Sequence, residues 1–393
     1  MRKLALIVCT AILAACAGND VMSGVDLCNR ENQLLETGMI YYGEDPDEEP
    51  FADMYYAFMA DEYEKEQASA KALRDFQMQV AGMTAKERKF LGAVFSDFAD
   101  LADMSSYVYK DGPAEIPHGW TDLGMQDPKI ARIINKYAVS GGMPTGLKCS
   151  LMGKGGRRLL VFAGTDFPSD WDDMDQVTDF LIDAYEDISG ALFKDASQVV
   201  LAGKLVDELI AGGYVNSSNL EFAGHSLGGR LASEMSVKYG CPAVLFNAAG
   251  VSPEIYTQYE ITRQEASRRW RGYVVDVVAA NDPLTCAQRY MSGITDPFVS
   301  SAAKAMSVDK TSMESLFSLG RGLLGAVVDN LAETSEVMAA VKGVTQAVGV
   351  VVDELYCRDY RALGAMMPIR EDMGGHGIEE LAAALRVRAQ ICR

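Results

Sequence analysis

The sequence predicts an α/β protein with a mainly parallel sheet, and two patterns carry this prediction. Short apolar segments alternate with helix-forming stretches from about residue 147 onward. Such an alternation is typical of a parallel sheet that helices cover on both faces. The segment Leu220–Ser236 also indicates a short strand, a glycine-flanked turn and a helix. With 393 residues, 49% of them hydrophobic, the chain is long enough for a large core and an accessory part.

The N-terminus has the pattern of a secretory signal. Arg2 and Lys3 precede a short apolar run that ends in Leu13-Ala-Ala-Cys16. The run is too short to span a bilayer as a finished helix. Its end resembles a bacterial lipobox, which implies cleavage before Cys16 and attachment of lipid to that cysteine. An ordinary signal with an incidental cysteine is the alternative. Because Ala17 is not aspartate, the same resemblance implies a lipid-anchored protein of the bacterial envelope, at the outer membrane.

The formal net charge of −19 argues against two classes of partner. A strongly acidic surface argues against binding nucleic acid and against electrostatic docking on anionic lipid headgroups. We therefore expect the protein to reach a membrane through the lipid on Cys16 and through apolar surface.

Six cysteines remain outside the signal and the lipid site. An even number outside the cytoplasm permits up to three disulfides, and we favour Cys286 with Cys357 because these two flank an inserted segment. No pair has zinc-ligand spacing and the chain has only three histidines, so we expect no metal and no other cofactor. The six are Cys28, Cys149, Cys241, Cys286, Cys357 and Cys392.

Changes in composition divide the chain into six parts. The linker is acidic, the extension is rich in helix formers, and leucines and valines repeat at helical spacing in the insertion. The insertion fits a lid, a membrane-facing surface or two ordinary helices buried against the core. The parts are the signal peptide 1–15, the lipidated cysteine and acidic linker 16–50, the helical extension 51–120, the α/β core 121–293, the helical insertion 294–356 and the C-terminal part of the core 357–393.

Within the core, strands and helices are expected in a fixed order. Apolar runs on either side of a Lys-Gly-Gly sequence indicate a hairpin, and later apolar runs indicate two further strands. The hairpin strands are Leu147–Leu151 and Arg157–Phe162, the helices are 172–187, 196–211 and 229–239, and the later strands are Ala243–Asn247 and Tyr273–Val278.

The centre of Leu220–Ser236 has the pattern of a nucleophile elbow. Residues 224–228 read Gly-His-Ser-Leu-Gly, with a strand before them and a helix after them. In such an elbow the serine lies at a strained turn with its hydroxyl exposed, and the helix start behind it can stabilise an oxyanion. Ser226 is therefore our candidate nucleophile. A glycine-rich turn that merely packs a helix on the sheet is the alternative.

A serine nucleophile needs a base, and the base needs an orienting acid. Asp282 follows the strand Tyr273–Val278 at its carboxyl end, where the sites of open α/β sheets gather. Asp276 and Asp296 are the other candidates for the acid. The base is expected to be His376, which lies in a glycine-rich turn before a C-terminal helix.

The two other histidines are less suited to act as the base. His118 lies in a turn-rich joint and reads as a loop residue. His225 is next to the serine, but adjacent side chains at an elbow point apart, so we expect it to pack beside the sheet. For the oxyanion we expect the backbone N–H of Leu227 and that of Thr165, which follows a strand at a Gly-Thr corner.

Four motifs together resemble the class 3 lipase family and its bacterial phospholipase A1-like relatives. They are Phe162-Ala-Gly-Thr165, Asp170-Trp171 with Met174-Asp175, Gly224–Gly229 with Leu231-Ala232, and Phe246-Asn-Ala-Ala-Gly250. The resemblance covers about residues 125–290, with His376 closing the set. It implies an α/β-hydrolase fold and hydrolysis of lipid carboxylic esters through Ser226, Asp282 and His376, with Thr165 and Leu227 at the oxyanion.

Three functions remain open on the sequence. The first is a lipid-anchored lipase or phospholipase acting on a lipid or acyl ester through an acyl-enzyme. The second is an esterase or thioesterase for short or non-lipid acyl substrates. The third is a surface lipoprotein that uses the fold for binding alone.

Overall fold

A computed structural model gives the fold. It describes residues 33–34, 36–41, 60–110, 115–117, 119–140, 143–164, 198–251, 274–282, 284–285, 363–372 and 374–393. The predictions for the signal peptide, Cys16, the helix 172–187, the insertion 294–356 and the Cys286–Cys357 pair lie outside these residues. Across the described ranges, no helix is both long enough and apolar enough to cross a membrane.

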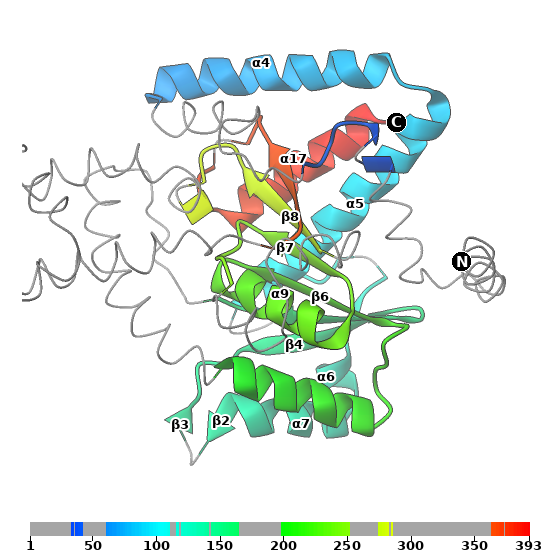
Figure 1. Ribbon diagram of the computed structural model, residues 1–393, viewed down its shortest axis with the longest axis vertical. Coiled ribbons are helices and arrows are strands. Elements are labelled where there is room, and N and C mark those ends of the chain that lie inside the picture. Colours follow the sequence, from blue (N-terminus) through cyan, green and yellow to red (C-terminus); the bar gives the residue numbers. More distant parts are fainter. Residues whose placement is uncertain are drawn as a thin grey trace, which may run out of the picture.

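Seven of the described strands form one sheet, in the order β1-β4-β5-β6-β7-β8-β9 (Figure 1). Strands β5 to β9 run parallel to one another, whereas β4 is antiparallel to β5 and β1 is antiparallel to β4. The predicted α/β class and mainly parallel sheet are therefore confirmed. The strands are β1 Thr121–Asp122, β4 Cys149–Lys154, β5 Arg157–Phe162, β6 Leu220–His225, β7 Ala243–Phe246, β8 Val274–Ala279 and β9 Ala365–Ile369.

The predicted hairpin is also present, although its first strand is Cys149–Lys154 and not Leu147–Leu151. Strands β4 and β5 pair from Cys149 with Phe162 to Lys154 with Arg157, so that Gly155 and Gly156 form the turn. Gly155 has a φ of 57°, a conformation that two-residue hairpin turns of this kind require and that glycine adopts without strain.

The alternation of side chains along β5 divides the core into two layers. Leu159 and Val161 lie in one cluster of buried residues, whereas Leu160 and Phe162 lie in the other. Since successive side chains of a strand point to opposite faces, the sheet buries both faces. The helices are α4 Glu62–Ala81, α5 Ala85–Tyr107, α6 Leu123–Gln126, α7 Pro128–Ala138, α9 Leu227–Tyr239 and α17 Ile378–Ile391, with a further helical segment over 198–211.

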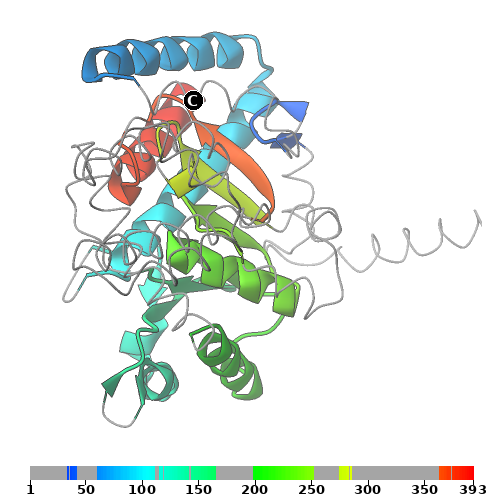
Figure 2. The same ribbon diagram turned by 60° about the vertical axis from the view of Figure 1, so that its left-hand side comes forward.

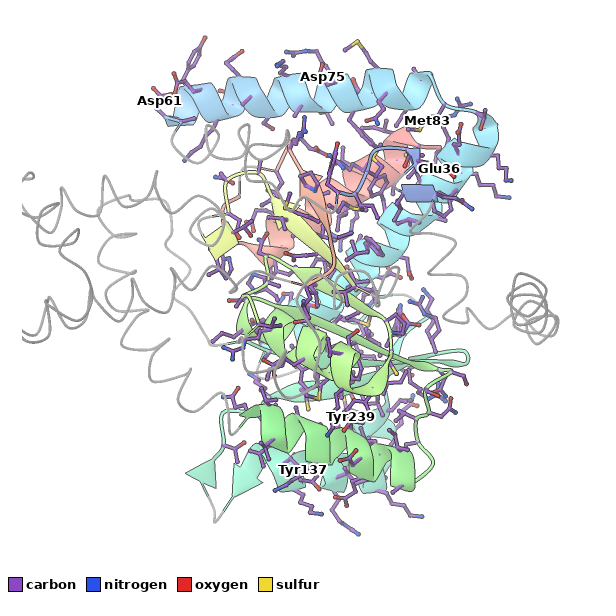
Figure 3. All side chains as sticks on the ribbon, viewed as in Figure 1. Glu36, Asp61, Asp75, Met83, Tyr137 and Tyr239 are labelled. Atoms are coloured by element: carbon purple, nitrogen blue, oxygen red, sulfur yellow. The ribbon has the colours of Figure 1, made fainter. Side chains whose placement is uncertain are left out.

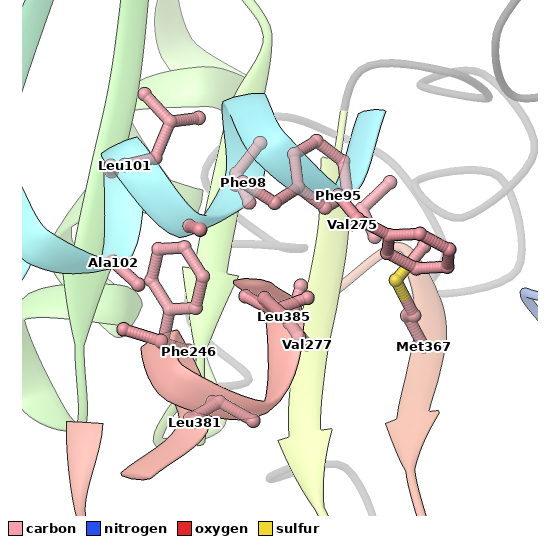
Figure 4. Packing of buried hydrophobic residues seen from close by; sticks show 14 of the residues in the cluster. Phe95, Phe98, Leu101, Ala102, Phe246, Val275, Val277, Met367, Leu381 and Leu385 are labelled. Atoms are coloured by element: carbon pink, nitrogen blue, oxygen red, sulfur yellow. The ribbon is translucent and has the colours of Figure 1, made fainter. Parts of the chain in front are cut away.

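One face of the sheet is covered by α5 and α17. Figure 4 shows the close packing of this layer, in which Phe95 and Phe98 of α5 approach Leu385 of α17 and the strands below. Helix α5 begins at a capping box, where the Thr84 hydroxyl accepts from the Glu87 N–H and the Glu87 carboxylate accepts from the Thr84 N–H. The helical spacing expected within the extension is therefore present, and α5 belongs to the main core.

The other face is covered by α9, α7 and the helical segment 198–211 (Figure 2). Tyr137 of α7 and Tyr239 at the end of α9, both labelled in Figure 3, each bond this segment. Their hydroxyls donate to Glu208 Oε2 at 2.6 Å and to Asp207 Oδ1 at 2.8 Å, respectively. A small separate sheet follows α7 and consists of β2 Val139–Ser140 and β3 Met143–Pro144.

Strand β9 was not predicted from the sequence. It contains Pro368, and a proline argues against a strand except at a sheet edge, where β9 lies. Its outer side is partly covered by Tyr41, which exchanges two backbone hydrogen bonds of 2.9 Å with Met366. Leu34 and Ile40 are buried close by, so this end of the segment predicted as a linker joins the core.

Three of the predicted disulfide candidates are free thiols. Cys149, Cys241 and Cys392 are buried and unpaired with another cysteine. Burial raises the pKa of the Cys149 thiol to about 12, so it stays protonated and unreactive. The estimate of up to three disulfides is therefore too high for this structure.

Candidate active site

Ser226 lies at a sharp turn between β6 and α9. Its φ of 57° and ψ of −127° are rare for a residue with a side chain, and its side chain does not cap the helix that follows. Such a backbone costs on the order of 1–3 kcal/mol and persists only where the surrounding structure fixes it. Ser226 is 1% exposed, and its N–H donates to Phe246 O at 3.1 Å. The strand, strained turn and helix predicted around the serine are all present. The predicted exposure of its hydroxyl is wrong, because the packed turn buries the side chain.

Two glycines of the motif allow this turn. A Cβ on Gly224 would overlap the carbonyl of Gly228, and a Cβ on Gly228 would overlap the carbonyl oxygen of Phe162 at the end of β5. The start of α9 therefore packs directly against the backbone that leads to Thr165.

We expect Gly228→Ala to lower the free energy of unfolding by about 2–4 kcal/mol, because backbone atoms must move to make room for the methyl group. Thermal unfolding followed by circular dichroism would measure the change. Gly82→Ala is a suitable control, since its Cβ would meet only ordinary contacts at the end of α4. Equal melting temperatures for the two variants would contradict the close packing of the elbow.

The predicted acid and base lie side by side. His376 Nδ1 is 2.6 Å from Asp282 Oδ1, and the two side chains are 4% and 0% exposed. The second oxygen of Asp282 accepts from the Thr285 N–H at 2.8 Å. Because a carboxylate only accepts, Nδ1 of His376 carries the proton of this bond, and Nε2 is the nitrogen that can take up another. Asp282 follows β8 and His376 follows β9, so parallel neighbours bring the two residues to one edge.

The other candidate acids are not in this position. Asp276 is buried within β8, where Oδ1 accepts from the Ala248 N–H at 3.3 Å. Asp296 lies outside the described residues, as do His118 and Thr165.

His225 contacts the loop of His376 and does not simply pack beside the sheet. Its Nε2 lies 2.7 Å from the backbone oxygen of His376, and the two ring centroids are 4.6 Å apart. The carbonyl can only accept, so Nε2 of His225 carries a proton that is committed to this bond. Burial lowers the pKa of His225 to about 3, which keeps the ring neutral near pH 7. The residue before the serine thus bonds directly to the candidate base.

Two asparagines that sequence analysis missed also hold this loop. Asn281 Oδ1 accepts from the Gly375 N–H at 2.9 Å, and Asn247 Nδ2 donates to Gly375 O at 3.4 Å. Asn247 has a φ of 44° and accepts from the Ala279 N–H at 2.9 Å. Both asparagines follow strands at the carboxyl edge of the sheet, which is the feature that could have identified them.

A buried carboxyl group lies at the base of the same loop. Asp372 Oδ1 accepts from the Gly374 N–H at 2.9 Å, whereas Oδ2 has no hydrogen-bond partner among the described residues. Burial raises the pKa of Asp372 to about 7, helped by nearby carboxylates that include Glu380 and Asp282. The folded protein therefore keeps a proton here that the unfolded chain releases at lower pH.

This shift predicts a pH-dependent loss of stability that Asp372→Asn should remove. As pH rises from about 4 through the folded-state pKa of about 7, the unfolded chain binds fewer protons than the folded one, so stability falls. At pH 8 the asparagine variant should be more stable than the wild type by on the order of 1–3 kcal/mol, with a much smaller difference at about pH 4.5. Denaturant unfolding at both pH values measures this. A difference that does not grow with pH would show that Asp372 ionises normally.

Leu227, the predicted oxyanion donor, is the first residue of α9. The N–H groups of the first turn of a helix have no acceptor within the helix and form a partly positive end. Gly164, which precedes Thr165, lies close to this turn, since a Cβ on Gly164 would come 3.1 Å from the Gly228 nitrogen.

The described residues contain no group of three or more histidine, cysteine, aspartate or glutamate side chains that could hold a metal ion.

Comparison with known families gives a match. A family model with the description "Phospholipase-like: Tle-like phospholipase domain" matches residues 100–345, which is more than half of the chain. The chain belongs to this Tle-like phospholipase family. No curated protein matches it. The match begins within α5 and includes Ser226 and Asp282, whereas His376 lies after it. Membership of the Tle-like phospholipase family supports a lipid-ester hydrolase of the phospholipase type, with lipid as the substrate.

Proposed function

We propose that the protein is a serine hydrolase that cleaves carboxylic esters of phospholipids through Ser226, His376 and Asp282. One observation carries the proposal. His376 bonds Asp282 at 2.6 Å in a buried position, on a loop that is itself bonded to His225 beside the strained serine. Acid, base and nucleophile thus belong to one connected set, in a chain of the Tle-like phospholipase family.

The arrangement of the strands supports an α/β-hydrolase fold. The serine turn follows β6 inside the sheet, the acid follows β8 and the histidine follows β9, in the chain order Ser, Asp, His. This order and the strand-turn-helix around Ser226 are those of α/β-hydrolases. The resemblance of the four sequence motifs to class 3 lipases agrees with this assignment.

The chemistry follows from the two hydrogen-bonding nitrogens of His376. With Nδ1–H held by Asp282, Nε2 takes the proton of the Ser226 hydroxyl as its oxygen attacks the ester carbonyl. The N–H groups of Leu227 and Thr165 bind the oxyanion. As the ester bond breaks, the lysophospholipid oxygen leaves with the proton from Nε2, and the acyl group stays on Ser226. Water, deprotonated by the same nitrogen, then releases the fatty acid and restores the serine.

The lipid predicted on Cys16 would place this site next to its substrate. A chain anchored in the outer membrane meets phospholipid at high local concentration, so an acidic surface would not prevent access. Phospholipase A1 specificity, cleavage of the sn-1 ester, is the regiochemistry that the class 3 resemblance favours.

Hydrolysis by the full chain in mixed micelles tests the proposal. Phosphatidylcholine with distinguishable acyl chains at the two positions, and p-nitrophenyl esters of increasing length, would be compared for the wild type and Ser226→Ala. We expect release of the sn-1 acid by the wild type alone. Turnover of only the shortest esters would favour the esterase alternative, and turnover of neither class above the alanine variant would leave a non-enzymatic binding role.

A further inference from the structure

Tyr109 lies where three segments of the candidate site meet. It lies two residues after the end of α5 at Tyr107. Its hydroxyl is 2.8 Å from the Gly164 nitrogen, 3.1 Å from His225 O and 3.3 Å from His225 Nδ1. A phenol has one proton and two lone pairs, so it accepts from the Gly164 N–H and donates its own proton to His225. Lys148 Nζ donates to the Tyr109 backbone oxygen at 2.6 Å, which holds the backbone of this residue.

His225 continues this contact to the opposite side. Its Nε2–H is committed to His376 O, so in the neutral ring Nδ1 is an acceptor that faces the Tyr109 hydroxyl. The two rings meet edge to face, with centroids 6.0 Å apart and an interplanar angle of 69°. The low pKa of His225, caused by burial, agrees with a ring that stays neutral and keeps this direction of hydrogen bonds.

The contacts form one chain from Gly164 through Tyr109 and His225 to His376. Gly164 is next to the predicted oxyanion donor Thr165, and His376 is the predicted base. Gly164, Tyr109 and His225 pack closely here, because a Cβ on Gly164 would come 2.7 Å from the Tyr109 hydroxyl and 3.0 Å from His225 O. The hydroxyl therefore connects Gly164 to the serine turn, and the imidazole connects the serine turn to the loop of His376.

We propose that Tyr109 and His225 are positioning residues, which hold Gly164 and the base His376 in register with Ser226. The proposal rests on the proposed function of that site. Neither side chain is assigned contact with substrate or a step in proton transfer. Their contribution is to fix distances, and a small misplacement of catalytic groups lowers the rate of the chemical step more than substrate binding.

Removal of the phenol hydroxyl tests the first link. Tyr109→Phe keeps the ring but removes the hydroxyl that accepts from the Gly164 N–H. We expect kcat to fall about 10- to 100-fold with KM changed less than about twofold. Tyr107→Phe is a matched control, since Tyr107 is the last residue of α5, two positions before Tyr109, and its hydroxyl bonds Asp122 at 3.2 Å. We expect Tyr107→Phe to retain wild-type kcat.

Two replacements of His225 test the second link. The amide nitrogen of glutamine can occupy the place of Nε2 and donate to His376 O, whereas leucine cannot donate. His225→Gln should therefore retain at least about tenfold more kcat than His225→Leu, with similar melting temperatures for both. In the double variant Tyr109→Phe with His225→Leu, kcat should be no more than about twofold lower than in the less active of the two single variants. The reason is that both residues act through the same series of hydrogen bonds.

The controls separate this inference from the proposed function. If the wild type does not hydrolyse phospholipid above Ser226→Ala, the proposed function fails. If the wild type is active and Tyr109→Phe matches Tyr107→Phe in kcat, the positioning role is wrong. It is also wrong if His225→Gln and His225→Leu are equally impaired, or if the losses of the single variants multiply in the double variant.

Discussion

Replacement of Ser226 by alanine is expected to reduce phospholipid hydrolysis by on the order of 10³- to 10⁶-fold, because the attacking oxygen is lost. The melting temperature should change little. Alanine has the same Cβ at the same φ of 57°, and the serine hydroxyl does not cap α9. Initial rates of fatty-acid release, with circular dichroism on the same samples, would measure both effects.

Ser233→Ala is the matched control for this variant. Ser233 is a fully buried serine on α9, the helix that follows Ser226, and its hydroxyl donates to Arg230 O at 2.8 Å. Loss of this bond should cost about 1 kcal/mol of stability without loss of turnover. A Ser226→Ala enzyme that keeps a tenth or more of the wild-type rate would mean that another group makes the attack.

The second large effect is expected at the acid. Asp282→Asn should lower kcat by about 10²- to 10⁴-fold, since a neutral amide neither stabilises the imidazolium of His376 nor fixes its tautomer. Asp276→Asn should lower kcat less than about fivefold, because the amide oxygen can still accept from the Ala248 N–H. Steady-state kinetics on both variants compare the two candidate acids directly.

The outcome separates two accounts of the site. A larger loss in Asp276→Asn than in Asp282→Asn would transfer the role of the acid to the aspartate within β8. Similar large losses in both, with lower melting temperatures in both, would indicate damage to β8 and not a specific role for Asp282.

Local patterns predicted the parts of the fold that depend on short-range physics. The hairpin around Gly155 and the strand-turn-helix around Ser226 follow from alternating apolar residues, from glycines at fixed offsets and from helix formers. Asp282 and His376 were predicted from chain order and from their places after a strand and before a helix. The structure brings these two together because β8 and β9 are parallel neighbours, although β9 itself was missed.

The residues that escaped sequence analysis act across long sequence separations. Tyr109 contacts His225 from 116 positions away, and Asn247 contacts Gly375 from 128 positions away. No periodic pattern marks such contacts, since they depend on which strand ends become neighbours. His225 could be excluded as the base from elbow geometry, but its bond to His376 O depends on the position of a loop 151 residues later. Cys16, Thr165 and the insertion 294–356 stay predictions.

Covalent labelling of the active serine tests the central claim most directly. The full chain would be incubated with a fluorophosphonate probe, digested, and the adduct located by mass spectrometry. If Ser226 is a nucleophile activated by His376, one adduct forms on Ser226, is absent in Ser226→Ala and forms far more slowly in His376→Ala. Absence of an adduct on Ser226 in a preparation that hydrolyses phospholipid would contradict the account.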